Sequence, residues 1–234
     1  MKGRKAMGTA RILSHSSEPF VDRTEAGQKL AHELQDLRGG GTVVLGIPRG
    51  GVIIARELTR ELDAELDIVL SRKLGAPGNP ELAIGAIAED GKVFRDDRII
   101  SALQVPEAYI AAETERQQTE IERRGARFRA VLPRVPLEGR TVIVTDDGLA
   151  TGATMQAALW AARQERPTRL ICAVPVGPTD TVRRLTEYVD ELVCLRLPPA
   201  FSAVGQFYVH FGQTDDEEVL AILSEANHER RALA

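Results

Sequence analysis

The sequence is poor in cysteine and contains no long apolar run. Its 234 residues include two cysteines, Cys172 and Cys194, and both fall in segments that are predicted to be buried strands. A zinc site is not supported, because there is no CxxC pair and no histidine close to either cysteine. No apolar segment approaches the ~20 residues that a membrane-spanning helix needs. We therefore expect reduced thiols in the core of a cytoplasmic protein.

An excess of positive charge is absent too, as are the common nucleotide-binding motifs. The chain has 30 Lys and Arg residues against 34 Asp and Glu residues, which gives a net charge of -4 and a pI near 5.7. This balance gives no support to nucleic-acid binding as a main role. Neither GxGxxG nor GxxxxGK followed by Ser or Thr occurs, so a dehydrogenase or a P-loop ATPase is not supported. Any phosphate site must therefore be local.

The first 17 residues differ in composition from the rest of the chain. They carry four positive side chains and no acidic one, at Lys2, Arg4, Lys5 and Arg11. The apolar stretch of a secretory signal is missing. An organelle-targeting segment is one interpretation, and a mobile tail over residues 1–17 is the one that we favour. Residues 18–234 are then expected to form a single domain.

The most informative stretch, VIVTDDGLATGAT, covers residues 142–154. Its four leading β-branched residues predict a buried strand, and Asp146 and Asp147 follow where that strand should end. A helix is predicted from about Gly152 onward. Amides at a helix N-terminus lack intrahelical partners and suit a phosphate, and the hydroxyls of the two threonines can add donors. The acids can accept hydrogen bonds from sugar hydroxyls or bind a cation, so the stretch is typical of a ribose 5-phosphate site.

This stretch closely resembles the binding motif for 5-phosphoribosyl 1-diphosphate (PRPP) in type I phosphoribosyltransferases. An ordinary helix cap would explain one acid and one threonine, but not two of each together with the small residues between them. The resemblance implies that Asp146 and Asp147 meet the ribose hydroxyls. It also implies that the following loop cradles the 5-phosphate, with PRPP-binding residues Gly148, Ala150, Thr151, Gly152, Ala153 and Thr154.

A second glycine-rich turn precedes the motif. Residues 42–47 predict a buried strand and residues 52–62 a helix, with Pro48-Arg49-Gly50-Gly51 between them. Arg49 offers a cation and the glycines permit close backbone approach, although a tight turn with a solvent-exposed arginine is the alternative. The resemblance implies that this loop grips the diphosphate group. The PRPP-binding set then also includes Gly50 and Gly51, and Arg49 has a catalytic role.

A third predicted strand, residues 65–70, leads into the basic pair Arg72 and Lys73. Paired cations at the end of a strand suit a diphosphate, and the family often has such a pair here, although alone they would be an ordinary charged strand end. Beyond a loop over residues 75–80, the segments 82–88 and 92–94 predict a hairpin. The resemblance places a flexible loop, which closes over PRPP, at about residues 74–95. We assign catalytic roles to Arg49, Arg72 and Lys73.

The remaining segments complete an α/β fold. Alternating strands and helices predict a mostly parallel sheet with helices on both faces, and the resemblance covers a core at about residues 42–197. A long charged helix over residues 106–129 is interpreted as a solvated surface in preference to an interaction surface. The family covers the acceptor base with a variable hood, for which residues 18–24 and 198–234 are the candidates. The aromatic residues of these candidate hood segments have two equal interpretations: they fix the tail to the core, or they contact the acceptor. The candidate acceptor contacts are Val176, Phe207 and Tyr208.

The resemblance implies a phosphoribosyl transfer to a nitrogen acceptor, a nucleobase or related compound, with release of diphosphate. Mg²⁺ is expected as a cofactor bound mainly through the diphosphate of PRPP, without direct protein ligands. Ala150 stands where enzymes that act on 6-oxopurines typically have an Asp, which disfavours a hypoxanthine or guanine acceptor. The expected partners are small-molecule substrates and a second copy in a homodimer, with no nucleic acid and no membrane. A PRPP-binding sensor without turnover is the alternative function.

Overall fold

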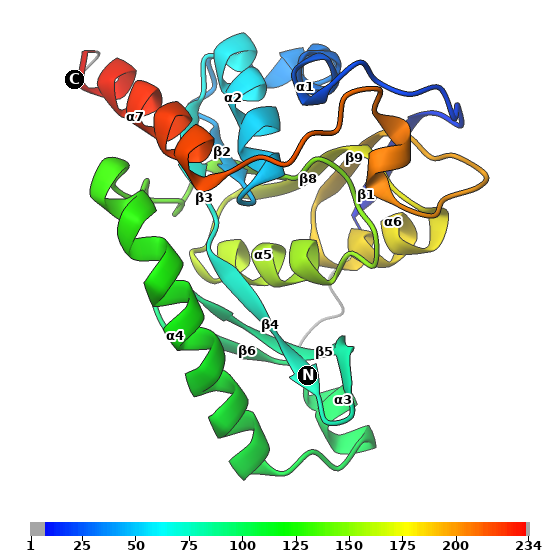
Figure 1. Ribbon diagram of the computed structural model, residues 1–234, viewed down its shortest axis with the longest axis vertical. Coiled ribbons are helices and arrows are strands. Elements are labelled where there is room, and N and C mark those ends of the chain that lie inside the picture. The colour runs from blue at the N-terminus through cyan, green and yellow to red at the C-terminus, as the bar shows by residue number, and fades with distance from the viewer. Residues whose placement is uncertain (1–7, 233–234) are drawn as a thin grey trace.

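The structure of the protein is a computed structural model, which describes residues 8–232 (Figure 1). Its largest element is a main β-sheet. Its six strands are all parallel and follow the order β1-β9-β8-β7-β2-β3. This arrangement confirms the predicted mostly parallel α/β fold. The strands are β1 (Thr9–Ser14), β2 (Val43–Gly46), β3 (Glu65–Ile68), β7 (Thr141–Thr145), β8 (Arg169–Val176) and β9 (Glu191–Arg196).

Helices cover both faces of this sheet because its strands are apolar on both sides. In β7, Ile143 belongs to the core that is packed with α1 (Arg23–His32) and α2 (Gly50–Leu62). Its neighbours Val142 and Val144 belong to a second core, packed with α5 (Ala153–Gln164) and α6 (Thr179–Leu185). Short 3-10 turns complete these layers at Gln35–Leu37 and Thr186–Tyr188.

The connections reverse direction between β2 and β7. From β2 the chain continues to β3 on one side, whereas from β7 it continues to β8 on the other. Gly46 is in register with Thr145 on one neighbour and with Ile68 on the other, so three strand ends lie side by side. Open α/β sheets bind ligands outside the carboxyl ends of their strands at such a reversal. The topology alone therefore points to the loops that follow Gly46, Ile68 and Thr145.

Residues 71–131 form a separate layer, which we call the arm. It contains the antiparallel sheet β4 (Ser71–Ala76), β5 (Asn79–Ala88) and β6 (Val93–Arg95), together with α3 (Asp97–Ala102) and the long α4 (Glu107–Val131). Figure 1 shows the arm below the main sheet, with α5 between them. The Phe94 ring stacks on that of Trp160 in α5, with centroids 4.0 Å apart, and thereby joins β6 to the main layer.

Three expectations about local structure need correction. The mobile tail proposed for residues 1–17 is wrong over Thr9–Ser14, which pairs with β9 as an edge strand; residues 1–7 lie outside the described residues. The strand predicted over residues 65–70 ends at Ile68, and residues 71–76 start a new strand. The loop predicted over residues 75–80 includes the ends of β4 and β5, because these strands pair across it.

The two segments expected to form a hood lie together. The Phe20 amide donates to the Phe207 carbonyl at 2.8 Å, and the Val209 amide donates back to Phe20 at 2.8 Å. A 3-10 turn, Val204–Phe207, and α7 (Asp216–Ala232) complete the chain. Within residues 8–232, no helix is both long and apolar enough to cross a bilayer. The two cysteines are free and buried, and burial raises the pKa of both thiols.

Candidate functional site

The turn after β7 contains the residues that the sequence predicts to cradle a phosphate, and it leads directly into a helix. Gly152 adopts a left-handed conformation, with φ at 74°, and α5 begins at the next residue. Amides in the first turn of a helix have no intrahelical acceptor and lie at its positive end. Ala150, Thr151 and Thr154 are exposed, so the loop is open to a ligand.

Helix α6 braces this loop from behind. The Thr181 hydroxyl donates to the Ala150 carbonyl at 3.0 Å, and the Arg184 guanidinium donates to the Thr151 carbonyl. Arg184 also donates to the side-chain carbonyl of Gln156 at 2.9 Å. These bonds occupy carbonyl oxygens, which would repel a phosphate. Sequence reasoning missed this support, because the residues of α6 and those of the loop are about thirty positions apart.

The acid pair lies directly beside the cradle. The Asp147 amide donates to Oδ1 of Asp146 at 2.9 Å, and the Arg23 Nε donates to Oδ2 of Asp147 at 2.8 Å. Although Asp146 keeps some accessible surface, its carboxyl group is surrounded by protein atoms. Burial, reinforced by the neighbouring Asp147 carboxylate, holds the pKa of Asp146 well above its usual range. The two acids are therefore not equivalent anions.

The glycines before α2 bring the neighbouring loop against these acids. A Cβ atom at Gly50 would lie 2.1 Å from Oδ2 of Asp147, and one at Gly51 would lie 2.7 Å from the Thr145 carbonyl oxygen. A side chain at Gly51 would meet backbone and force the two loops apart, whereas one at Gly50 would displace the Asp147 carboxylate. The peptide bond between Pro48 and Arg49 is cis. The structure thus joins the two sequence motifs into one site.

The three predicted cations line one cavity of about 260 Å³. Arg49, Arg72 and Lys73 share it with Thr154 of the phosphate cradle, whereas Asp146 and Asp147 lie outside its lining. Helix α4 forms the opposite wall. Its buried side chains, including Ile121 and Phe128, show that the helix is packed along one face and not simply solvated. Acidic side chains line it too, and Asp216 lies 3.9 Å from Arg49, but the basic residues outnumber them. We call this cavity between the main sheet and the arm the basic cleft.

The hood residues are arranged differently from a surface that would contact an acceptor. Phe207 is 1% exposed and stacks on Phe201, and Tyr208 is 6% exposed. The Tyr208 hydroxyl donates to the Asp147 carbonyl at 2.6 Å, and burial raises the pKa of this phenol. Val176 is fully buried, and its carbonyl accepts from Leu149 at 2.8 Å. In this structure Tyr208 therefore fixes the hood to the site loop, Phe207 packs within the hood, and Val176 joins β8 to the same loop.

Arg23 is a site residue that the sequence did not reveal. Besides binding Asp147, it donates to the Gly212 carbonyl at 2.9 Å and lies 4.0 Å from the centre of the Phe211 ring. It links α1, the hood and the acid pair. The preceding Asp22 caps α1, which makes Arg23 look like an ordinary first-turn residue. Arg23 and Asp147 are 124 positions apart in the sequence, and only the folding of the chain brings them into contact.

Oxygen ligands for a metal are sparse here. Among the described residues, no group of three or more His, Cys, Asp or Glu side chains could hold a metal ion. The two adjacent carboxylates could contribute to a site that substrate phosphates complete, which is a usual mode of Mg²⁺ binding. The donor chemistry therefore fits a cation that arrives with a phosphorylated ligand.

Comparisons with known proteins agree with this geometry. The family model described as "Phosphoribosyl transferase domain" matches residues 23–211. A Mycobacterium tuberculosis protein, provisionally named a phosphoribosyl transferase, is 46% identical over 210 residues; the match covers 90% of this chain but 47% of that protein. The bifunctional protein PyrR of Leifsonia xyli is 26% identical over 86% of this chain and 92% of its own length.

Among solved structures, that of TT1426 from Thermus thermophilus superposes with a TM-score of 0.84. It is 45% identical, and the match covers 88% of this chain and 98% of that one. This chain spans about half the length of its M. tuberculosis relative, so the activity of that whole protein is a separate question. The matched region includes both site loops, the basic pair and the hood segment up to Phe211. The chain belongs to the phosphoribosyl transferase domain family.

Proposed function

We propose that this protein transfers the 5-phosphoribosyl group of PRPP to a nitrogen acceptor and releases diphosphate. The observation that carries this proposal is the meeting of three features at one reversal of the sheet: the phosphate cradle, the acid pair and the basic cleft. A phosphorylated sugar with a second phosphate group needs these three kinds of contact. A helix N-terminus alone would not supply them.

The sugar would bind across the two loops. Its 5-phosphate would accept hydrogen bonds from the amides of residues 152–154 and from the hydroxyls of Thr151 and Thr154. Its two ring hydroxyls would donate to Asp146 and Asp147. Because Arg23 already donates to Oδ2 of Asp147, a sugar hydroxyl would take the other oxygen or displace Arg23. The acid pair and the phosphate cradle are contiguous in the chain. The loop after β7 would therefore hold both the ring hydroxyls and the 5-phosphate of the sugar.

The reaction would break the bond between C1 and the diphosphate oxygen and form a bond between C1 and the acceptor nitrogen. The electron pair of the broken bond leaves with diphosphate, and the acceptor loses a proton. Arg49, Arg72 and Lys73 would stabilise the negative charge that grows on the leaving group. Mg²⁺ bound through the diphosphate would neutralise part of the same charge. The protein's contribution is thus positioning and electrostatic stabilisation.

The acceptor would approach C1 from the hood side. Ala150 lacks the carboxyl group that handles a proton in members acting on 6-oxopurines, so we propose an acceptor outside hypoxanthine and guanine. Phe201 is partly exposed and packs on the buried Phe207, and Phe211 is 39% exposed, so these two rings are accessible aromatic faces of this segment. Incubation of the protein with PRPP, Mg²⁺ and a panel of bases and amines, with diphosphate release as the readout, would identify the acceptor.

A PRPP sensor without turnover is the second candidate. The cation-lined cleft favours the enzyme, because a sensor need not stabilise a departing diphosphate. Tight PRPP binding with no turnover over a broad panel would favour the sensor. Assembly as a homodimer is a further proposal, which sedimentation of the purified chain would test.

Replacement of Asp146 and Asp147 tests PRPP binding directly. We expect the double variant Asp146→Asn, Asp147→Asn to lose PRPP binding by calorimetry and to keep its fold by circular dichroism. The control variant Asp36→Asn, Asp63→Asn removes the same charge from two exposed positions and should bind normally. Unchanged affinity in the first variant would refute the assignment of the acid pair.

A further inference from the structure

Helix α4 forms the wall of the cleft with polar side chains that are almost fully buried. Glu113 is 7% exposed and Gln117 is 6% exposed, and both line the cavity that Pro48 and Arg49 line from the loop before α2. Burying a carboxylate or an amide is unfavourable unless each polar atom is hydrogen-bonded. A helix that only covered the arm would be expected to present apolar residues here. The contacts of these two side chains therefore indicate what this wall does.

Their hydrogen bonds form a short chain that ends on Arg72. The Arg72 Nε donates to Oε1 of Gln117 at 2.8 Å, and Nε2 of Gln117 donates to Oε1 of Glu113 at 2.9 Å. Arg116 donates to both oxygens of Glu113, at 2.8 and 2.9 Å. An ionised carboxylate can only accept, so Glu113 must face the NH₂ end of the amide. The carbonyl of Gln117 is thereby turned toward Arg72.

We infer that Gln117 of α4 is a positioning residue that aims the Arg72 guanidinium at the leaving diphosphate. This inference rests on the proposed function and deepens it. Gln117 takes the Nε hydrogen and leaves the two terminal nitrogens of the planar fork for phosphate oxygens. Because the amide is neutral, it holds Arg72 without cancelling its charge.

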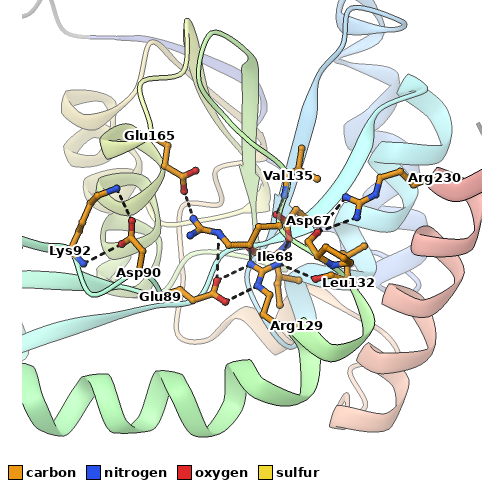
Figure 2. Close-up of polar contacts among 12 residues, drawn as sticks. Asp67, Ile68, Glu89, Asp90, Lys92, Arg129, Leu132, Val135, Glu165 and Arg230 are labelled. Carbon is orange, nitrogen blue, oxygen red and sulfur yellow. Dashed lines mark hydrogen bonds and ion pairs between the residues drawn. The ribbon is translucent and has the colours of Figure 1, made fainter. Parts of the chain in front are cut away.

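Arg129, at the other end of α4, shows the contrasting arrangement. Its nitrogens donate to the carboxylates of Asp67 and Glu89, at 2.5 to 2.8 Å, so its charge is already balanced inside the protein (Figure 2). An arginine held in this way is structural. Arg72 donates to an amide instead of a carboxylate, and Glu120, which also lines the cleft, acts on it through its charge. The Arg72 guanidinium can therefore still bind an anionic ligand in the cleft.

Two replacements of Gln117 test the inference in the full-length chain. Gln117→Met keeps the length of the side chain but removes the acceptor. Gln117→Glu keeps the shape but replaces the NH₂ group that donates to Glu113 with a second carboxyl oxygen, so an ionised side chain here would pair with Arg72 and repel Glu113. Gln118→Met is the matched control on the next position of the helix, where the amide contacts Glu122 instead. The probes are inorganic diphosphate, PRPP and ribose 5-phosphate, each titrated by calorimetry in the same Mg²⁺ buffer. Circular dichroism of each variant establishes that it is folded.

We expect Gln117→Met to weaken diphosphate and PRPP binding about tenfold, the usual size for one hydrogen bond to a charged group. An ionised Gln117→Glu side chain should weaken both by more than tenfold, because it neutralises Arg72 and disturbs the contact with Glu113. Ribose 5-phosphate should bind all three variants like the wild type. Wild-type diphosphate affinity in folded Gln117→Met, or a loss that ribose 5-phosphate shares, would overturn the inference. Failure of the wild-type chain to bind PRPP would instead overturn the proposed function.

Discussion

Two carboxyl groups near the ends of parallel strands, those of Asp67 and Asp146, differ in the partners that surround them. Asp67 in β3 accepts hydrogen bonds from Arg129, from the Val135 amide and from the Ile68 amide, at 2.5, 2.8 and 2.7 Å (Figure 2). Burial raises its pKa, and each of these donors opposes that shift. Asp67 is therefore a compensated group that ties β3 to the arm and to the loop that leads into β7.

Asp146, after β7, is contacted by backbone amides and not by a guanidinium: the Asp147 amide donates to it at 2.9 Å, and the amides of Asp147 and Gly51 offset only part of its pKa shift. Burial raises its pKa, and the adjacent Asp147 carboxylate adds to the shift instead of opposing it. The Arg23 guanidinium binds Asp147 and acts on Asp146 only through its charge. Strongly perturbed acids of this kind concentrate at functional sites, although ion-pair networks such as that of Asp67 also shift pKa values. The comparison separates a carboxylate whose partners belong to the fold from one whose hydroxyl partners would come with a ligand.

The largest effect is expected from breaking the compensated group. Arg129→Met leaves the buried Asp67 and the partly exposed Glu89 without their guanidinium, which should lower the free energy of unfolding by about 3–5 kcal/mol. Urea unfolding measures this loss. Adding Asp67→Asn to Arg129→Met should restore part of it, because the uncompensated charge is removed. A loss below about 1 kcal/mol in the single variant would show that this network is not structural.

Gly50→Ala tests the packing at the uncompensated site. The new Cβ would overlap Oδ2 of Asp147 and approach Nε of Arg23 to 3.0 Å, so the Asp147 carboxylate and the Arg23 side chain must shift. We expect a loss of about 1–3 kcal/mol in stability, as for other overpacked positions. PRPP affinity should fall at least tenfold in the same variant. Gly139→Ala, at a turn where a Cβ meets nothing within 4 Å, serves as a glycine control for stability, although its positive φ adds local strain there.

Asp146→Asn should stabilise the protein at neutral pH, on the order of 1 kcal/mol, while it weakens PRPP binding. The folded state holds the pKa of Asp146 above that of the unfolded chain. Wild-type stability therefore falls as pH rises through the unfolded pKa, near 4, and stops falling above the folded pKa. The Asp146→Asn variant does not lose this stability, because its amide does not ionise. Thermal unfolding from pH 4 to pH 8 should show a gap that opens with rising pH; a constant gap would contradict the raised pKa.

Much of this fold could be predicted from the sequence because it depends on local patterns. The runs of β-branched residues before Gly46 and before Asp146 each become a strand, and the turns that follow them lead into helices as expected. Strand β1 could not be predicted in this way. Its residues alternate poorly between buried and exposed, and it is held in place by pairing with β9, far away in the sequence.

The site residues also separate into those that could be predicted from the sequence and those that could not. The acids and the cradle are contiguous, so their chemistry can be read directly, whereas Arg23 reaches Asp147 only through tertiary packing. Gln117 is hidden among the charges of α4, which give the helix a solvated appearance until its packing on the cleft is known. The burial of Tyr208 depends on how the tail folds back over the site. Sequence patterns identify what the chain offers to a ligand, but not the groups that hold those residues in place.

The smallest effect is expected at the rim of the Asp67 network. Arg134 donates to Glu165 at 2.5 Å and approaches Glu89 to 4.0 Å, but its side chain is 40% exposed. Arg134→Met should therefore cost about 0.2–1 kcal/mol and lower the melting temperature by no more than about 4 °C, with a smaller loss at high salt. Arg129 and Arg134 each lie within 4.0 Å of Glu89, and they differ in burial and in hydrogen bonding to the backbone. If Arg134→Met proved as costly as Arg129→Met, the contrast between compensated and rim charges would fail, and proximity to Glu89 alone would explain the stability of this region.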